Sequence, residues 1–160
     1  MICDESITTG RNFFALTRDA APHTWLQLSG GSIGLGIPMA TGAAIACPDR
    51  KVINLQADGS GLYTVQALWT QAREHLDVVT LVWSNRSYAI LRAELANVGA
   101  LNPGPKALSM LSLDEPAVDW VSLARGFGVE GRRVETLADF IAAFQHALAN
   151  TGPHLIEVAL

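Results

Sequence analysis

Apolar residues along this chain alternate between short continuous runs and longer stretches with helical spacing. The clearest run, residues 78–83, is β-branched almost throughout, which is typical of a strand buried on both faces. Polar or glycine-rich turns end the runs and mark where each strand stops. We predict strands at residues 2–3, 25–28, 52–56, 78–83, 129–134 and 154–158.

The stretches between the runs predict helices. Residues 38–46 are rich in Ala, Met and Ile and predict a buried helix. Apolar residues from Val65 to Ala72 recur at i, i+3, i+4 and i+7, which predicts a helix with Trp69 on its core face. Residues 97–112, with three Gly or Pro residues near their middle, predict a mobile loop. Further helices are predicted at 117–125 and 136–149.

Strands that alternate with helices of this length predict a parallel sheet. Crossovers between parallel strands are right-handed, so each strand–helix–strand unit has a defined hand. We therefore predict one α/β domain over residues 1–160, a three-layer doubly wound parallel sheet with helices on both faces. The abrupt start at Ile2–Cys3, with no lead-in, is expected of a domain cut from a longer chain.

Composition narrows the class of protein further. The chain has 160 residues, of which 49% are hydrophobic and 16% charged, as expected for a globular protein with a buried interior. The net charge is −4 and basic residues do not cluster, which excludes a nucleic-acid surface. Cys3 and Cys47 form no disulfide framework, and we expect both thiols to be buried. No apolar run reaches membrane-spanning length and no signal peptide begins the chain, so we expect a cytoplasmic location.

Two polar residues come after neighbouring predicted strands. Asp58 comes just after the strand at 52–56, and Asn85 just after the strand at 78–83. The carboxyl ends of parallel strands meet at one edge of a sheet, where ligands bind. A carboxylate and an amide oxygen at that edge are ligands that Mg²⁺ prefers.

A phosphate site is predicted at the same place. Gly59 and Ser60 begin the helix after Asp58, and the free N–H groups of a helix N-terminus favour an anion. The chain therefore predicts a Mg²⁺–diphosphate site. The competing interpretation is that Asp58 caps a helix and Asn85 only ends a strand.

A glycine-rich turn at residues 29–36 precedes the buried helix. It is not a dinucleotide fingerprint, because Met39 stands where the third glycine belongs. Its glycines indicate either that a ligand approaches the backbone closely or that the turn is tight. Glu5 comes after the first strand and is expected to have a structural role. The four histidines show no metal-ligand spacing, and His75 and His146 are expected at the surface.

The residues around Asp58 and Asn85 resemble a known family, the C-terminal diphosphate-binding domain of thiamine-diphosphate enzymes of the acetolactate synthase and benzoylformate decarboxylase group. Its signature is Gly-Asp-Gly and then, after some 25–30 residues, Asn. Here the signature reads Ala57-Asp58-Gly59-Ser60 and then Ser84-Asn85-Arg86-Ser87-Tyr88. The resemblance covers essentially the whole chain and also includes Gly30-Gly31-Ser32-Ile33-Gly34.

The resemblance implies a role for each matching residue. Asp58, the side chain of Asn85 and the backbone carbonyl of Ser87 would bind Mg²⁺. Gly31 would accept a hydrogen bond from the aminopyrimidine ring, Ile33 would wedge between the two cofactor rings, and Ser32 between them would also contact the cofactor. The diphosphate would contact Thr8, Gly59, Ser60, Tyr88 and Ala89.

The resemblance also implies an activity and partners. The cofactor supplies most of the chemistry, a decarboxylation of a 2-keto acid such as pyruvate, with subsequent transfer to a second keto acid or protonation. This makes the whole protein an acetolactate synthase-like transferase or a carboxy-lyase. The activating glutamate belongs to a pyrimidine-binding domain that has no place in this chain. We therefore expect no catalytic residue here, an inactive isolated chain, and a homo-oligomer completed by that domain.

The chain departs from the family pattern at two positions. Ala57 replaces the first signature glycine, and if that position needs a positive φ the alanine costs about 1 kcal/mol. Ser84 replaces a first asparagine that many members carry. Four interpretations stay open: a catalytic fragment, a split cofactor-binding subunit, a non-catalytic remnant, and an unrelated Mg²⁺-dependent phosphate-binding domain.

Overall fold

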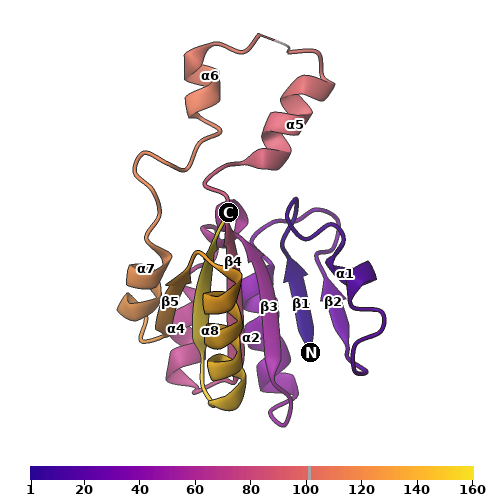
Figure 1. Cartoon of the computed structure of the whole chain (residues 1–160), viewed down its shortest axis with the longest axis vertical. Coiled ribbons are helices and arrows are strands. Elements are labelled where there is room, and N and C mark those ends of the chain that lie inside the picture. Colours follow the sequence, from indigo (N-terminus) through magenta and orange to yellow (C-terminus); the bar gives the residue numbers. More distant parts are fainter. Residues whose placement is uncertain (101) are drawn as a thin grey trace.

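The computed structural model describes residues 1–100 and 102–160 and contains a six-stranded sheet (Figure 1). All neighbouring strands are parallel, in the spatial order β2-β1-β3-β4-β6-β5. This confirms the predicted α/β class. The strands are β1 (Ile2–Glu5), β2 (Trp25–Gln27), β3 (Val52–Ala57), β4 (Val78–Ser84), β5 (Glu130–Val134) and β6 (His154–Ala159).

Helices cover both faces of the sheet. Helices α2, α4 and α7 pack on one face, where Ile37, Leu68 and Trp120 share a core cluster. Helix α8 covers the other face through Ala143 and Ala147. The helices are α1 (Phe13–Leu16), α2 (Gly36–Ala46), α3 (Asp58–Gly61), α4 (Ala67–Arg73), α5 (Ala89–Asn97), α6 (Pro105–Ser109), α7 (Trp120–Gly126) and α8 (Leu137–Ala149).

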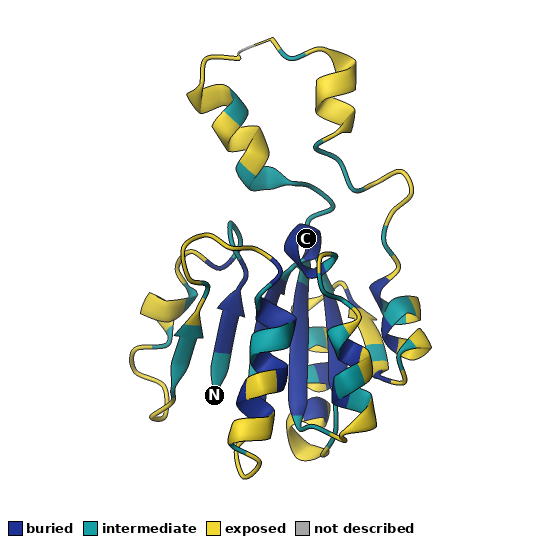
Figure 2. Ribbon diagram, turned by 180° about the vertical axis from the view of Figure 1, so that it is seen from behind, coloured by how far each residue is buried: buried dark blue, intermediate teal, exposed yellow. Residues whose placement is uncertain are grey.

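Strand β4 lies at the centre of the sheet, between β3 and β6. Successive side chains of a strand point to opposite faces. Accordingly Leu81 packs in the cluster under α8, and its neighbour Val82 packs in the cluster under α7. Both faces of β4 are buried (Figure 2), which is the physical reason for its continuous apolar run.

Helices α5 and α6 form an arm that stands away from the sheet beyond the end of β4 (Figures 1 and 2). The two segments that connect the arm to the body pair with each other through an antiparallel bridge between Ser87 and Ser112. The predicted loop at 97–112 is wrong over 105–109, where α6 begins with Pro105 in its first turn. Residue 101 of that loop lies outside the described residues. Helix α5 is absent from the sequence prediction.

The predicted burial of Trp69 is also wrong. Helix α4 begins at Ala67, later than its apolar pattern suggests, and buries Leu68 and Gln71. The Trp69 side chain is 51% exposed, and the Arg73 guanidinium lies 4.8 Å from the centre of its ring. Cys3 is buried as predicted, whereas Cys47 is only partly buried. Among the helices of residues 1–100 and 102–160, none is both long and apolar enough to cross a bilayer.

Candidate functional site

Strands β3 and β4 deliver Asp58 and Asn85 to the same edge of the sheet. The two strands pair in parallel with Ala57 opposite Trp83, so Asp58 follows the paired segment directly and Asn85 follows it by two residues. The Asp58 Oδ2 atom accepts a hydrogen bond of 2.6 Å from the backbone N–H of Arg86, the residue after Asn85. The Asn85 Oδ1 atom accepts one of 3.0 Å from the N–H of Ser87. The two predicted metal ligands therefore belong to one connected loop arrangement.

A small cavity of about 50 Å³ lies at this edge. It gathers all the predicted site residues except Gly31 and Ser32. Gly31 lines a neighbouring cavity of about 350 Å³, and Ile7 lines both cavities. Ser32 lies on the exposed turn between Gly31 and Ile33. The lining residues are Ile7, Thr8, Ile33, Ala57, Asp58, Gly59, Ser60, Asn85, Ser87, Tyr88, Ala89 and Ile90.

Asp58 is a buried acid in this cavity. Its side chain is 3% exposed, and the residues that the structure describes place no Lys, Arg or His nitrogen within ion-pair distance of its carboxylate. Burial raises the pKa of Asp58, and hydrogen bonds from the Arg86 and Gly59 N–H groups oppose that shift. A buried carboxylate that lacks a basic partner fits a bound cation, because a cation supplies the missing positive charge. Together with the amide oxygen of Asn85, the donor set suits Mg²⁺.

The turn after Asp58 differs in detail from the predicted phosphate cradle. The Gly59 N–H already donates to the Asp58 Oδ1 atom at 2.8 Å. The Ser60 hydroxyl donates to the carbonyl of Ala57 at 3.2 Å and accepts from the Gln56 amide at 2.7 Å. A β-carbon on Gly59 would lie 2.7 Å from the ring of Tyr88. Any larger residue here must therefore displace the Tyr88 ring.

Ala57 adopts an extended backbone, with φ −80° and ψ 145°. Alanine takes this conformation without strain. The energetic penalty considered for a residue other than glycine at this signature position therefore does not arise.

Ile7, which lines the cavity, and Arg86, which lies between two lining residues, have an unusual backbone. Ile7 has φ 51° and Arg86 has φ 52°, which lie in the left-handed region that residues other than glycine seldom occupy. Such conformations cost free energy and cluster at functional sites. At Arg86 the conformation accompanies the N–H contact to Asp58.

Glu5 is a positioning residue whose contacts sequence reasoning missed. Its side chain is 1% exposed and lies at the end of β1. The Oε1 atom accepts hydrogen bonds from the N–H groups of Gly34 at 2.5 Å and Leu35 at 3.3 Å. The Oε2 atom accepts from the N–H of Gly36 at 2.6 Å and from the Gln56 amide at 3.0 Å. Glu5 thus fixes the glycine turn and the start of α2 against the ends of β1 and β3.

The glycine turn itself needs glycine for its backbone. Gly30, Gly31 and Gly34 have positive φ angles of 62°, 68° and 89°. A β-carbon on Gly36 would also come within 2.7 Å of the Glu5 Oε2 atom. The available signal in the sequence was an acid that comes after a buried strand and precedes a glycine-rich helix N-terminus.

Comparison with known proteins places this arrangement in context. Residues 8–158 match the family described as "Thiamine pyrophosphate enzyme, C-terminal TPP binding domain". The chain is 50% identical, over 161 residues, to the "Putative acetolactate synthase large subunit IlvX" of Mycobacterium tuberculosis, a match that spans all of this chain and 31% of that protein. It is 35% identical to the benzoylformate decarboxylase of Pseudomonas aeruginosa over 96% of this chain and 28% of that protein.

A solved structure shows the same likeness. The thiamine diphosphate-dependent 4-hydroxybenzoylformate decarboxylase of Rhodococcus jostii RHA1 superimposes with a TM-score of 0.79 at 34% identity. The match covers 92% of this chain and 32% of that one. The chain thus spans about a third of the length of the proteins that it resembles.

Proposed function

Because this chain belongs to the family of C-terminal TPP-binding domains of thiamine pyrophosphate enzymes, we propose that it binds thiamine diphosphate and Mg²⁺ as part of an acetolactate synthase-like enzyme. Membership of the family confirms the resemblance carried by the signature at Asp58 and Asn85. The observation that carries the proposal is the buried Asp58 carboxylate, which shares a cavity with Asn85 and has no basic partner among the described residues.

The proposed metal ligands are Asp58, Asn85 and the backbone carbonyl of Ser87. Asp58 supplies the negative charge, and its hydrogen bonds to Gly59 and Arg86 hold the carboxylate in place. The proposed contacts of the cofactor's organic part are Gly31 and Ile33, on the turn that Glu5 fixes. The proposed diphosphate contacts are Thr8, Gly59, Ser60, Tyr88 and Ala89.

The chemistry is divided between the cofactor and its surroundings. When bound, thiamine diphosphate supplies the carbanion chemistry that breaks the bond to the carboxylate of a 2-keto acid such as pyruvate. The residues of this chain hold the metal, orient the diphosphate and shape the turn beside the cofactor rings. The proton relay that activates the cofactor is proposed to come from a pyrimidine-binding domain, of the same or another chain. We therefore expect the isolated 160-residue chain to bind cofactor but to release no CO₂ from pyruvate.

Calorimetry tests the binding proposal. Thiamine diphosphate and ATP are titrated separately into the purified chain, with and without Mg²⁺. We expect thiamine diphosphate to bind in a Mg²⁺-dependent manner and ATP to bind more weakly. Asp58→Asn should lower the affinity for thiamine diphosphate at least about tenfold, which is about the smallest effect of disturbing a metal-ligand set. Asp49→Asn, an exposed acid in the turn before β3, is the matched control and should bind as wild type does.

Each outcome of the titration is decisive. ATP binding as tight as thiamine diphosphate binding would contradict the proposed preference for thiamine diphosphate. Cofactor binding that is absent from the chain alone, but restored by a pyrimidine-binding domain, would identify a split subunit. If neither condition gives binding, the chain is a non-catalytic remnant and the proposal is wrong.

A benzoylformate decarboxylase-type lyase is the second candidate, favoured by the likeness to benzoylformate decarboxylases in both sequence and structure. The two activities differ in the step after decarboxylation, since a carboligase adds a second keto acid and a simple lyase adds a proton. Product analysis of the completed enzyme with pyruvate and with benzoylformate separates them. Acetolactate from pyruvate supports the first candidate, and benzaldehyde from benzoylformate supports the second.

A further inference from the structure

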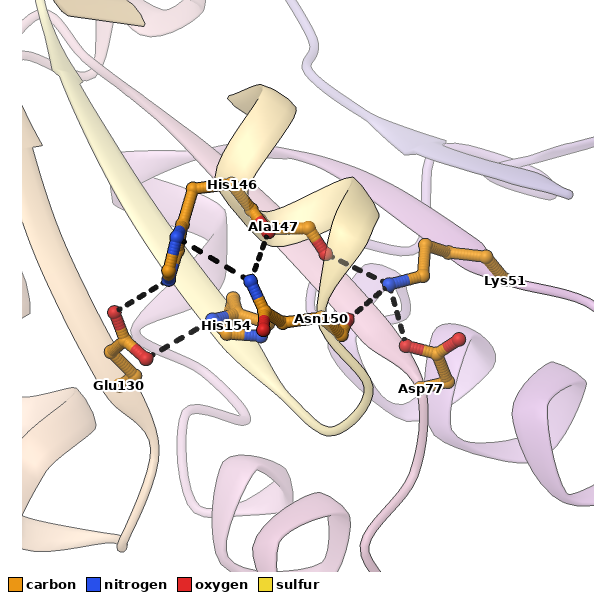
Figure 3. A network of polar contacts seen from close by, with 7 residues as sticks. All are labelled: Lys51, Asp77, Glu130, His146, Ala147, Asn150 and His154. Carbon is orange, nitrogen blue, oxygen red and sulfur yellow. Dashed lines mark hydrogen bonds and ion pairs between the residues drawn. The ribbon is translucent and has the colours of Figure 1, made fainter. Parts of the chain in front are cut away.

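Two histidines and a glutamate meet at the edge of the sheet opposite the cofactor cavity. Glu130 begins β5, His154 begins β6, and His146 lies in the last turn of α8. Asp58 and Asn85 instead lie just past the carboxyl ends of their strands, so the two sites lie at opposite ends of the parallel strands. One ligand atom from each of Glu130, His146 and His154 lies within 4.8 Å of the other two. Figure 3 shows both imidazole rings directed toward the Glu130 carboxylate.

The separations of these atoms suit a shared metal ion. The His146 Nε2 atom lies 3.5 Å from Glu130 Oε1, and the His154 Nδ1 atom lies 3.5 Å from Glu130 Oε2. Direct hydrogen bonds between such groups are shorter, about 2.7–3.2 Å. Tetrahedral ligands placed 2.0–2.1 Å from Zn²⁺ are about 3.4 Å from each other. Each of these two distances is therefore close to one edge of a zinc coordination shell, and the two edges end on different oxygens of the Glu130 carboxylate.

A cavity of about 20 Å³ lies among these side chains. That volume is enough for one water molecule or ion. His154 is 7% exposed and lines this cavity together with Glu130 and His146. Glu130 supplies a negative charge. Arg132 also lines the cavity, but its side chain is exposed, so solvent and salt screen its repulsion of a cation.

The backbone around His146 is held firmly (Figure 3). The Lys51 ammonium donates hydrogen bonds to the carbonyls of Ala147 at 2.8 Å and Asn150 at 2.6 Å, and pairs with Asp77 at 2.8 Å. The Asn150 amide donates to the His146 carbonyl at 2.8 Å. These contacts tie the end of α8 to the strand ends and fix one proposed ligand relative to the others, as a metal site requires.

We propose that Glu130, His146 and His154 form a binding site for a divalent transition-metal ion of the Zn²⁺ type, separate from the cofactor cavity. Imidazole nitrogens select such an ion over Mg²⁺, which prefers oxygen ligands. Three protein ligands leave a fourth position for water. The ion links β5, α8 and β6, so its binding stabilises the folded chain.

The test is a titration of the untagged chain with Zn²⁺ by calorimetry in excess Mg²⁺, together with thermal unfolding. We expect one Zn²⁺ per chain and a rise in Tm. The variants Glu130→Gln and His146→Gln alter exposed side chains, so they should remain folded and lose affinity at least about tenfold. His75→Asn removes an exposed histidine outside the cluster, keeps a residue that tolerates its φ of 51°, and should bind as wild type does.

Co²⁺ provides a second measurement, because its visible spectrum reports a tetrahedral site with nitrogen ligands. The proposal is overturned if wild type binds no stoichiometric Zn²⁺, or if His146→Gln binds it equally well. It is also overturned if Asp58→Asn alone abolishes binding, since Zn²⁺ would then occupy the cofactor cavity. Zn²⁺ binding does not depend on thiamine diphosphate, so the two proposals can fail separately.

Discussion

Replacing Glu5 by glutamine tests whether one buried carboxylate holds the glycine turn in place. The two side chains have nearly the same shape, but glutamine carries an NH₂ group where one carboxylate oxygen stood. Both Glu5 oxygens accept two hydrogen bonds each. In Glu5→Gln, the two donors that contacted the replaced oxygen therefore face the new NH₂ group, which is itself a hydrogen-bond donor.

The loss can be estimated from these four contacts. If the new NH₂ group replaces Oε2, the Gln56 side chain can turn over and present its own oxygen, which has no hydrogen-bond partner in the structure. The Gly36 N–H is then left unpaired, at a cost of about 1–3 kcal/mol. Loss of a negative charge beside the N-terminus of α2 adds about 0.3–1 kcal/mol. We expect Glu5→Gln to lower the free energy of unfolding by about 1–4 kcal/mol, a large part of a typical total.

Urea denaturation of wild type and Glu5→Gln measures this difference. Hydrogen exchange of the Gly34 and Gly36 amides shows whether the loss is local, and both should exchange faster in the variant. Glu74→Gln, a surface acid, is the control and should change stability by less than about 0.5 kcal/mol. A Glu5→Gln chain within about 0.5 kcal/mol of wild type, with unchanged exchange at Gly34 and Gly36, would refute the reasoning.

Two further changes give separate tests. In Gly59→Ala the new methyl group meets the Tyr88 ring at 2.7–2.8 Å and displaces it by about 1 Å, so we expect a loss of about 1 kcal/mol in urea denaturation and weaker cofactor binding. Adding Tyr88→Ala should remove the unfavourable coupling in a double-mutant cycle, and additive losses would contradict the contact. Burial raises the pKa of Glu157, so the native state binds a proton more readily than the unfolded state does. Wild-type stability should therefore fall as pH rises from the ordinary pKa of 4.5 through the raised pKa of the native state. Glu157→Gln should lack that fall in denaturation curves between about pH 4 and pH 8, and identical pH profiles would contradict it.

Local patterns were enough to predict the parallel sheet and the edge at which Asp58 and Asn85 lie. The continuous run of β4 reflects burial on both faces, and the edge position of Asp58 and Asn85 results from parallel pairing alone. These features depend on neighbouring residues, or on one strand–helix–strand unit. For that reason a single sequence reveals them.

The features that the sequence did not predict either lack buried residues or depend on contacts between residues far apart in the chain. Helix α5 buries no residue, so the core imposes no apolar stripe that would reveal it. The buried face of α4 includes Gln71, whose amide donates to Thr41 of α2 at 3.0 Å, a polar contact that apolar spacing does not indicate. The contacts of Glu5 join residues 29 to 51 positions apart. The histidine cluster draws on three elements, so spacing along the chain hides it.

The relaxed backbone at Ala57 bears on how relatives of this domain are recognised. A search pattern that insists on glycine ahead of the signature aspartate excludes chains whose geometry makes no such demand, since a φ of −80° admits any ordinary side chain. The glycine after the aspartate is the stricter criterion, because a methyl group there must displace the Tyr88 ring. A pattern anchored on aspartate, that second glycine and the later asparagine would recover such chains.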